Sequence, residues 1–301
     1  MTFRQLQSFL AVVRAKSFRR AAEKLALSQP ALSQQIKELE RELDARVFDR
    51  LGRAIALTQA GRLLEEYAQR IVSMVQGLRE AMGQLRGLER GVLRLGASTT
   101  PGIYLLPGLL ARFKTRHPKT EVSLHIGNTR EIEERVRAAE VDLGIVGGHV
   151  SDAKETCVEA RLLDRIVLII PRQHPWAARR AVSGERLREE CLLVREEGSA
   201  TRRVIDTALD RAGISPGSRL ELGHTEAIKQ GVLAGLGVAF VSEYAIRSEL
   251  AARRLRTVRV QGIAIQRHFH VIRYEGRVLS PLERAFLDFF GAETQSRRPR
   301  R

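Results

Sequence analysis

The sequence predicts a multidomain α/β protein, with an N-terminal winged helix-turn-helix, a long linker helix and a two-lobed α/β region. Three observations predict it. Residues 1–58 show helical periodicity and then a short hairpin pattern, residues 59–90 carry one apolar helical stripe, and from residue 92 short β-type runs alternate with helical stretches. A length of 301 residues suits two or three domains.

The charge balance indicates a polyanionic partner. The chain carries 51 Lys and Arg against 35 Asp and Glu, a formal net charge of +16, and such an excess most often serves nucleic-acid binding. Residues 1–60 alone hold eleven basic and six acidic residues. Because nearly all the basic residues are Arg, a coding bias is the alternative explanation.

The composition excludes several classes of protein. Cys157 and Cys191 are too few for a disulfide scaffold or a cysteine zinc module, and their apolar settings predict buried structural thiols rather than a redox switch. No apolar run approaches the roughly 18–20 residues of a membrane span, and the N-terminus lacks the pattern of a secretion signal. We therefore expect a cytoplasmic protein without a membrane partner.

The pattern within residues 1–58 predicts three helices and a hairpin. Apolar residues recur at helical spacing over residues 3–27, with Ser17 as the N-cap of the second helix. After a break, Pro30 suits the first turn of a third helix, because its missing N–H costs little there. Residues 44–57 lack helical periodicity and predict a small hairpin, or wing.

The third helix has the chemistry of a recognition helix. Such a helix needs short polar side chains near its N-terminus to reach base edges in the major groove, while cations in a wing meet phosphates or the minor groove. The residues expected to contact DNA are Ser17, Ser28, Gln29, Pro30, Ser33, Gln34, Lys37, Arg50 and Arg53. Periodicity alone leaves open an ordinary helical bundle with a solvated polar face.

A long helix is expected after the hairpin. Thr58 can cap it, and the pattern ends near Gly87 and Gly91, which suits a domain linker. Apolar residues step by three or four over about three heptads, at Leu64, Tyr67, Ile71, Met74, Leu78, Met82 and Leu85. The stripe either joins two copies of the chain or packs on the chain's own core.

The remainder alternates between strand and helix patterns, which predicts α/β folding with mostly parallel sheets. Strands are expected at 92–97, 121–126, 141–146, 166–170, 192–194, 238–241 and 268–272. Helices are expected near 102–116, 129–139, 200–212, 225–235 and 279–290. Residues 293–301 end in four arginines with no apolar residue among them, and we expect a basic disordered tail there.

The first domain also carries a specific set of residues in a fixed order and spacing. The set comprises Ser17-Phe18, Ala21-Ala22-Glu23-Lys24-Leu25, Ser28-Gln29-Pro30-Ala31-Leu32-Ser33, Ile36, Leu39-Glu40, Leu43, Phe48, Arg50 and Leu57-Thr58-Gln59-Ala60-Gly61. It resembles the winged domain of the LysR-type transcriptional regulators. Two residues depart from that family's pattern: Arg19 stands where a small polar residue is common, and Asp44 where Gly is common.

The resemblance implies a domain layout and an assembly. It implies a winged helix-turn-helix at 1–58, a dimerising linker helix at 59–90, and an effector domain like a periplasmic binding protein. The effector domain would have a first lobe at 91–164 and 266–292 and a second lobe at 165–265, with the hinge near 162–165 and 265–269. Double-stranded DNA would be the partner, and homodimers would assemble into a homotetramer.

A candidate effector site lies in the α/β region. The segment Gly96–Gly102 follows an expected strand and opens a helix, so its backbone N–H groups and hydroxyls can hold an anion. Simple N-capping by these hydroxyls is the alternative. The resemblance places the family's effector at this loop. The residues expected to bind it are Ser98, Thr99, Thr100, Asn128, Thr129, Gly147, Ser199, Thr201, Arg202 and Thr225, with Arg202 as a bidentate partner for a carboxylate or phosphate.

A further resemblance narrows the effector class. Leu105-Leu106-Pro107, Asn128-Thr129-Arg130-Glu131 and Asp142-Leu143-Gly144 resemble a branch of the family that includes regulators of carbon fixation and sulfur assimilation. This favours a small anionic metabolite as the effector.

Catalysis finds little support in the sequence. There is no G-x-S-x-G, H-E-x-x-H or P-loop pattern, so we expect no catalytic residue, no metal site and no cofactor. The sequence therefore predicts a DNA-binding transcription factor controlled by a small molecule. The alternative is a solute-binding α/β protein or a small-molecule enzyme with an incidental helical extension.

Overall fold

The structure is a computed structural model that describes residues 1–51, 54–85, 91–148 and 156–295. The chain divides into two compact units. The first unit comprises residues 1–86 with 276–280, and the second comprises residues 87–275 with 281–301. Each unit has its own hydrophobic core.

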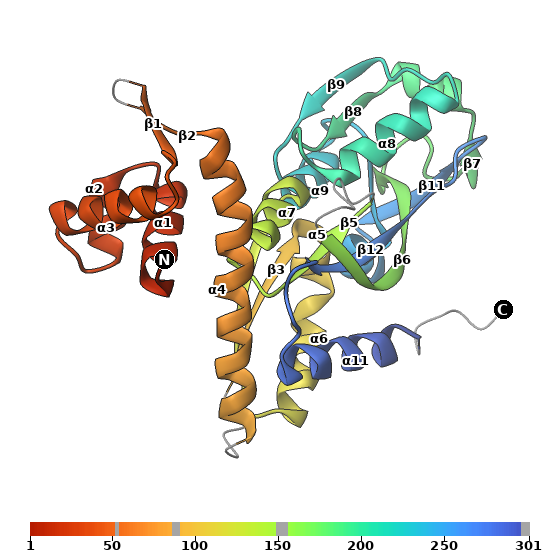
Figure 1. The fold of residues 1–301 in the computed structure, drawn as a ribbon. Coiled ribbons are helices and arrows are strands. Elements are labelled where there is room, and N and C mark those ends of the chain that lie inside the picture. The colour runs from red at the N-terminus through yellow and green to blue at the C-terminus, as the bar shows by residue number, and fades with distance from the viewer. Residues whose placement is uncertain (52–53, 86–90, 149–155, 296–301) are drawn as a thin grey trace. The chain divides into compact units, whose positions relative to one another are not determined.

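The first unit is a winged helix-turn-helix followed by a long helix (Figure 1). The hydroxyl oxygens of Thr2, Ser17 and Ser28 accept backbone N–H bonds at the starts of its first three helices. The predicted helices and hairpin are therefore present. The elements are α1 (Phe3–Ala15), α2 (Phe18–Lys24), α3 (Gln29–Glu42), β1 (Phe48–Leu51), β2 (Ala54–Leu57) and α4 (Gln59–Leu85).

Three aromatic rings join the hairpin to the helices. The ring of Phe48 in β1 lies 5.2 Å from that of Phe9 in α1 and 5.6 Å from that of Phe18, measured between centroids. Phe9 is fully buried, and such aromatic pairs add to the stabilisation from area burial. The wing is thus fixed to the helical core at its first residue.

Asp44 and Arg19, the two departures from the family pattern, have local explanations. Asp44 adopts a φ of 48° just after α3, in the left-handed region that glycine enters without strain and aspartate enters more readily than most residues. Arg19 pairs with Glu23 at 3.1 Å on the exposed side of α2.

Thr58 begins α4 as predicted. Its hydroxyl accepts the N–H of Gly61 at 2.9 Å and donates to the carbonyl of Arg46 at 2.6 Å. Leu64 and Ala68 join the core of the first unit. Further along, five residues of the stripe are 36–62% exposed, namely Tyr67, Ile71, Met74, Leu78 and Met82. At these five positions the stripe does not pack on the chain's own core, which was the alternative expectation.

The second unit is built on a mixed sheet in the order β4-β3-β5-β12-β6-β11-β7, with β10 also paired to β6. The strands are β3 (Val92–Ser98), β4 (Glu121–Gly127), β5 (Leu143–Gly147), β6 (Thr156–Pro171), β7 (Ala181–Val182), β8 (Cys191–Val194), β9 (Ser218–Glu221), β10 (Ala239–Ser242), β11 (Leu255–Val260) and β12 (Ile265–Tyr274). The helices are α5 (Thr99–Tyr104), α6 (Leu106–Arg116), α7 (Thr129–Arg137), η1 (Gly184–Glu189), α8 (Ala200–Arg211), α9 (Thr225–Leu233), η2 (Glu243–Ile246), α10 (Arg247–Ala251) and α11 (Pro281–Gln295).

Two long strands tie this unit together. We call β3–β5 with α5–α7 the first half, and β7–β11 with α8–α10 the second half. The 16-residue β6 and its antiparallel neighbour β12 lie between them in the sheet order. Side chains that end strands in either half can therefore meet across one cleft.

The expectation of mostly parallel sheets is wrong at the centre of the unit. β3 pairs in parallel with β4 and β5, but β12 runs antiparallel to β5 and β6, as do β10 and β11 to β6. A run of apolar residues indicates a buried strand but not its direction, so the returning strands could not be oriented from their composition.

Other differences lie at short or exposed segments. β7, β9 and β11 were not expected, and β9 is exposed at every residue, so it has no apolar run to reveal it. Helix α11 continues through residues 293–295, where a disordered tail was expected, and residues 296–301 lie outside the described chain. Cys157 and Cys191 are free and half-buried rather than fully buried.

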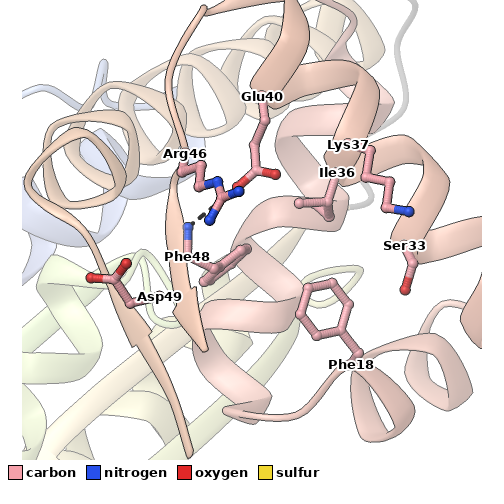
Figure 2. A pocket seen from close by; sticks show the side chains of 8 residues that line it. All are labelled: Phe18, Ser33, Ile36, Lys37, Glu40, Arg46, Phe48 and Asp49. Atoms are coloured by element: carbon pink, nitrogen blue, oxygen red, sulfur yellow. Dashed lines mark hydrogen bonds between the residues drawn. The ribbon is translucent and has the colours of Figure 1, made fainter. Parts of the chain in front are cut away.

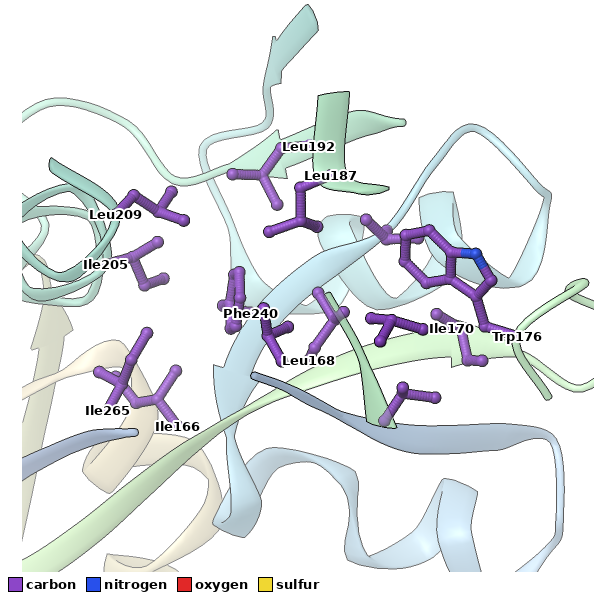
Figure 3. Close-up of a cluster of buried hydrophobic side chains, with 14 of the residues drawn as sticks. Ile166, Leu168, Ile170, Trp176, Leu187, Leu192, Ile205, Leu209, Phe240 and Ile265 are labelled. Atoms are coloured by element: carbon purple, nitrogen blue, oxygen red, sulfur yellow. The ribbon is translucent and has the colours of Figure 1, made fainter. Parts of the chain in front are cut away.

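The core of the second half packs against α8, the helix whose first residues line the candidate site. Ile205 and Leu209 of α8 pack with Ile166, Leu168 and other buried side chains, among them Trp176 and Phe240 (Figure 3). Burial of Ile205 and Leu209 therefore helps to hold α8, whose first residues line the candidate site.

Candidate functional site

The first unit presents a groove between the third helix and the wing (Figure 2). The groove has a volume of about 590 Å³. Ser33 and Lys37 of α3 lie along it, and Arg46 adds a second cation before β1. The other lining residues are Phe18, Ile36, Glu40, Phe48 and Asp49. The helix and the wing thus present polar and cationic side chains to one shared space.

Glu40 fixes the wing against the helix. Its Oε1 accepts the backbone N–H of Val47 at 2.9 Å and that of Phe48 at 3.4 Å. These N–H groups belong to the residue before the hairpin and to its first residue, and a carboxylate acceptor makes such bonds stronger than neutral ones. The sequence analysis did not single out Glu40 for this role, because its partners are backbone groups.

The predicted DNA-binding residues divide into three groups. Ser17 and Ser28 use their hydroxyls to cap α2 and α3, and Gln29 and Pro30 form the first turn of α3. The polar side chains further along the helix are Ser33, Gln34, whose amide donates to Glu38 at 2.9 Å, and exposed Lys37. The side chain of Arg50 and all of Arg53 lie outside the described chain.

The second unit contains a cavity lined from both halves. The residues around it are Ser98, Thr99, Thr100, Asn128, Thr129, Arg195, Ser199, Ala200, Thr201 and Arg267. Seven of them belong to the predicted effector set. The free space is about 10 Å³, room for roughly one water molecule, so a metabolite needs the side chains or the halves to move.

Arg195 spans the cleft. It directly follows β8 and is 5% exposed. Its guanidinium makes two bonds to Glu196, at 2.7 and 2.8 Å. It also donates to Thr225 Oγ1 at 2.9 Å in its own half. In the opposite half it donates to Thr99 Oγ1 at 3.2 Å. One cation therefore orders hydroxyls on both sides of the cavity.

Arg267 supplies a second buried cation from β12. It donates to Asp164 at 2.8 Å and to Thr201 Oγ1 at 2.8 Å. Its Nη2 is buried and has no hydrogen-bond partner. Burial raises the pKa of Asp164, while the charge of Arg267 and the hydroxyl of Ser242 act against the rise. Arg267, which lines the cavity, thus has one buried nitrogen whose donors are not used.

Helix N-termini add partial positive charge beside the same cavity. The N-cap of α8 is Ser199, whose side chain makes no capping bond, and Ser98 before α5 likewise makes none. Asn128 caps α7 through the N–H of Glu131 at 3.0 Å. Unengaged hydroxyls beside the N-terminus of α8 suit an anion.

Three predicted effector residues do not line the cavity. Gly147 lies behind Arg267, because a Cβ there would meet its Nη1 at 3.0 Å. Thr225 reaches the site only through Arg195. Arg202 donates to the carbonyl of Arg195 at 3.0 Å and pairs with acidic side chains away from the cavity.

Sequence reasoning missed Arg195 and Arg267, the two cations of the site. Each had a signal. Arg195 directly follows the buried run Leu192–Val194, and Arg267 occupies an inward position of an alternating strand. A charged residue at such a place is costly unless it is paired. Among the described residues, no group of acidic, histidine or cysteine side chains could hold a metal ion, and no helix there is long and apolar enough to cross a membrane.

Two family models match the chain. The model described as "Bacterial regulatory helix-turn-helix protein, lysR family" matches residues 3–62. The model described as "LysR substrate binding domain" matches residues 86–295. Together these matches take in residues 3–62 and 86–295, and so reach both units of the structure.

Individual proteins agree with these matches. The RuBisCO operon transcriptional regulator of Allochromatium vinosum is 36% identical over 97% of this chain and 96% of its own length. The regulatory domain of CcmR from Synechocystis, solved in complex with 2-PG, is 33% identical, covers 69% of this chain and 99% of that chain, and has a TM-score of 0.64. A full-length OxyR variant from Pseudomonas aeruginosa covers 100% of this chain and 99% of its own, with a TM-score of 0.76 at 24% identity, and so shares the fold.

Proposed function

Because this chain belongs to the LysR family of transcriptional regulators, we propose that a small anionic metabolite binds in the cavity of its second unit and controls how the first unit binds DNA. The family is one of DNA-binding regulators with an effector domain, not of enzymes. The observation that carries the anionic class is the presence of two buried guanidinium groups, Arg195 and Arg267, on one cavity.

The hydrogen-bond inventory of the cavity favours an acceptor-rich ligand. Arginine only donates, and backbone N–H groups at helix starts also donate. Arg195 and Arg267 already share their charge with Glu196 and Asp164, so the ligand is held by the remaining donors. These are Arg267 Nη2, the start of α8, and the hydroxyls of Ser98, Thr100 and Ser199. A phosphate or carboxylate meets this inventory.

We propose 2-phosphoglycolate as the first compound to test, since CcmR, a relative, binds 2-PG. The compound carries a phosphate and a carboxylate on a short chain, which suits a cavity with one arginine on β12 and another after β8. Calorimetry should detect binding of 2-phosphoglycolate and weaker binding of glycolate or inorganic phosphate alone. No heat from any small anion, with the protein folded, would contradict the anionic site.

We infer that the first unit reads DNA through α3, with Ser33, Gln34 and Gln29 toward base edges and the wing toward the backbone. The exposed stripe on α4 supports a homodimer, since heptad-spaced apolar residues pair between helices, and the resemblance to the family implies a homotetramer. Both assemblies act on DNA in the cytoplasm. A footprint upstream of the chain's own gene, with and without 2-phosphoglycolate, tests the whole proposal: an effector-dependent two-fold site supports it, and absence of specific protection overturns it.

A further inference from the structure

A second contact joins the two halves of the effector unit outside the cavity. Tyr104, the last residue of α5, donates its hydroxyl to Glu226 of α9 at 3.1 Å. Glu226 in turn accepts from Lys229 at 2.8 Å. The Lys229 ammonium lies 5.1 Å from the centroid of the Tyr104 ring, within cation–π range.

Lys229 is buried to 3% exposure between two carboxylates. Its Nζ lies 2.8 Å from Glu226 and 2.8 Å from Glu249 of α10, which is also buried. A buried ammonium is costly unless its donors are satisfied, and here both carboxylates and the ring face it. Exposed Arg254 approaches Glu249 at 3.8 Å from the outer side. The arrangement fixes the Glu226 carboxylate at the position where the phenol meets it.

The protonation states suit this bond at neutral pH. Burial raises the pKa of Tyr104 to about 12, so the phenol remains a donor. The hydrogen bond from Lys229 lowers the pKa of Glu226 below its usual value, so that carboxylate remains an acceptor. The bond is therefore charge-assisted, and such bonds are roughly twice as strong as neutral ones.

Arg195, which lines the cavity, also joins the first residues of these two helices. Thr99 opens α5 and Thr225 opens α9, and Arg195 donates to both. Helices α5 and α9 are thus joined once through the cavity and once through Tyr104 and Glu226, which do not line it. Because the cavity has room for roughly one water molecule, a metabolite needs its side chains or the two halves to move, and contacts of this kind oppose movement of the halves.

We propose that Tyr104, Glu226 and Lys229 form a latch between the halves, which positions α5 against α9 and sets how fast the cavity opens. None of the three residues lines the cavity. The effect on effector exchange rests on the proposed function, whereas the effect on opening of the effector-free protein does not.

The Tyr104→Phe variant tests the latch, because it removes one hydroxyl and keeps the ring beside Lys229. In the full chain without effector, hydrogen–deuterium exchange should rise about 3- to 10-fold in α5 and α9, the change expected for one partly exposed charge-assisted bond. The matched control is Thr115→Val on α6, which removes a hydroxyl that bonds the carbonyl of Ala111 in its own helix. Unchanged exchange in α5 and α9, or an equal rise throughout the chain with a lower Tm, overturns the latch.

A double-variant cycle identifies the partner. If the phenol acts through Glu226, adding Glu226→Gln to Tyr104→Phe should raise exchange no further than the larger single effect, whereas additive effects would overturn the pairing. With 2-phosphoglycolate as the probe, Tyr104→Phe should also speed dissociation several-fold. If the compound fails to bind even the unaltered chain, the proposed effector is wrong, and the exchange data on the effector-free protein still decide the latch.

Discussion

Gly61, in the first turn of α4, lies so close to the carbonyl oxygen of Val47 that a Cβ atom has no room between them. The contact joins the long helix to the residue before the wing. Thr58 reinforces it, because its hydroxyl binds both Gly61 and Arg46. These contacts explain why Thr58 and Gly61, which belong to the family pattern, occur at these positions.

Gly61→Ala should displace the wing or the helix. The added carbon meets backbone, which cannot turn away, so we expect a loss of about 1–3 kcal/mol of stability and weakened DNA binding. Gly77→Ala on the same helix is the matched control. A Cβ there meets Val278 at an ordinary 3.4 Å, and alanine favours a helix by roughly 0.5–1 kcal/mol. Thermal unfolding of both variants checks the pair, and equal behaviour would contradict this account.

Variants of the buried pair Asp164 and Arg267 separate the effect on stability from the effect on ligand binding. Asp164→Leu should destabilise the chain by about 3–5 kcal/mol, because it leaves the guanidinium buried and uncompensated. The double variant with Arg267→Met should recover most of that loss, since an apolar pair of similar volume often replaces a buried ion pair at little cost. It should nevertheless lose affinity for 2-phosphoglycolate. Chemical denaturation and calorimetry measure the two effects, and a double variant that keeps its ligand affinity would remove Arg267 from the site.

Thr100 offers a test within the cavity. It is buried there, and Thr100→Val keeps its shape while removing the hydroxyl. We expect effector affinity to fall by about tenfold or more, the effect of leaving an anion short of one donor, with DNA binding unchanged. Thr115→Val is the control, because Thr115 lies on α6 and bonds only its own helix, at Ala111. An unaltered dose–response curve for Thr100→Val would exclude that hydroxyl.

Acid should weaken the effector unit through the Lys229 cluster. The bond from Lys229 lowers the pKa of Glu226 below the usual 4.5, so this group stabilises the fold above its unfolded pKa and loses that contribution as pH falls through its lowered folded pKa. Glu249 is shifted in the same direction, although burial opposes the shift. Glu226→Gln should therefore reduce the fall in Tm on acidification below about pH 4.5. A fall as steep as in the unaltered chain would show that other carboxylates dominate.

The parts of the fold that could be predicted are those with local signals. Ser17 and Thr58 cap helices as expected, because a hydroxyl before an apolar period is a local pattern. The hydroxyl-rich loop at Ser98–Thr100 was likewise predicted as a candidate site, and it lines the cavity. Arg195 and Arg267 were not predicted as site residues, because their roles depend on partners 30 to 103 positions away in the chain. Such pairings arise from topology. The return of this segment to the first lobe was expected, but the antiparallel direction of β12, which pairs Arg267 with Asp164, was not.

The recognition helix allows base readout and backbone contact to be separated. Ser33→Ala should reduce affinity for a specific site more than for unrelated DNA, because it removes a hydroxyl that we propose contacts base edges. Lys37→Ala should weaken both about equally and lower the slope of log affinity against log salt by about one, as expected for one lost phosphate contact. Both side chains lie along the groove between α3 and the wing. Affinities measured between 50 and 200 mM salt on the two DNAs distinguish the roles, and a Ser33 variant that loses both affinities equally would make Ser33 a backbone contact.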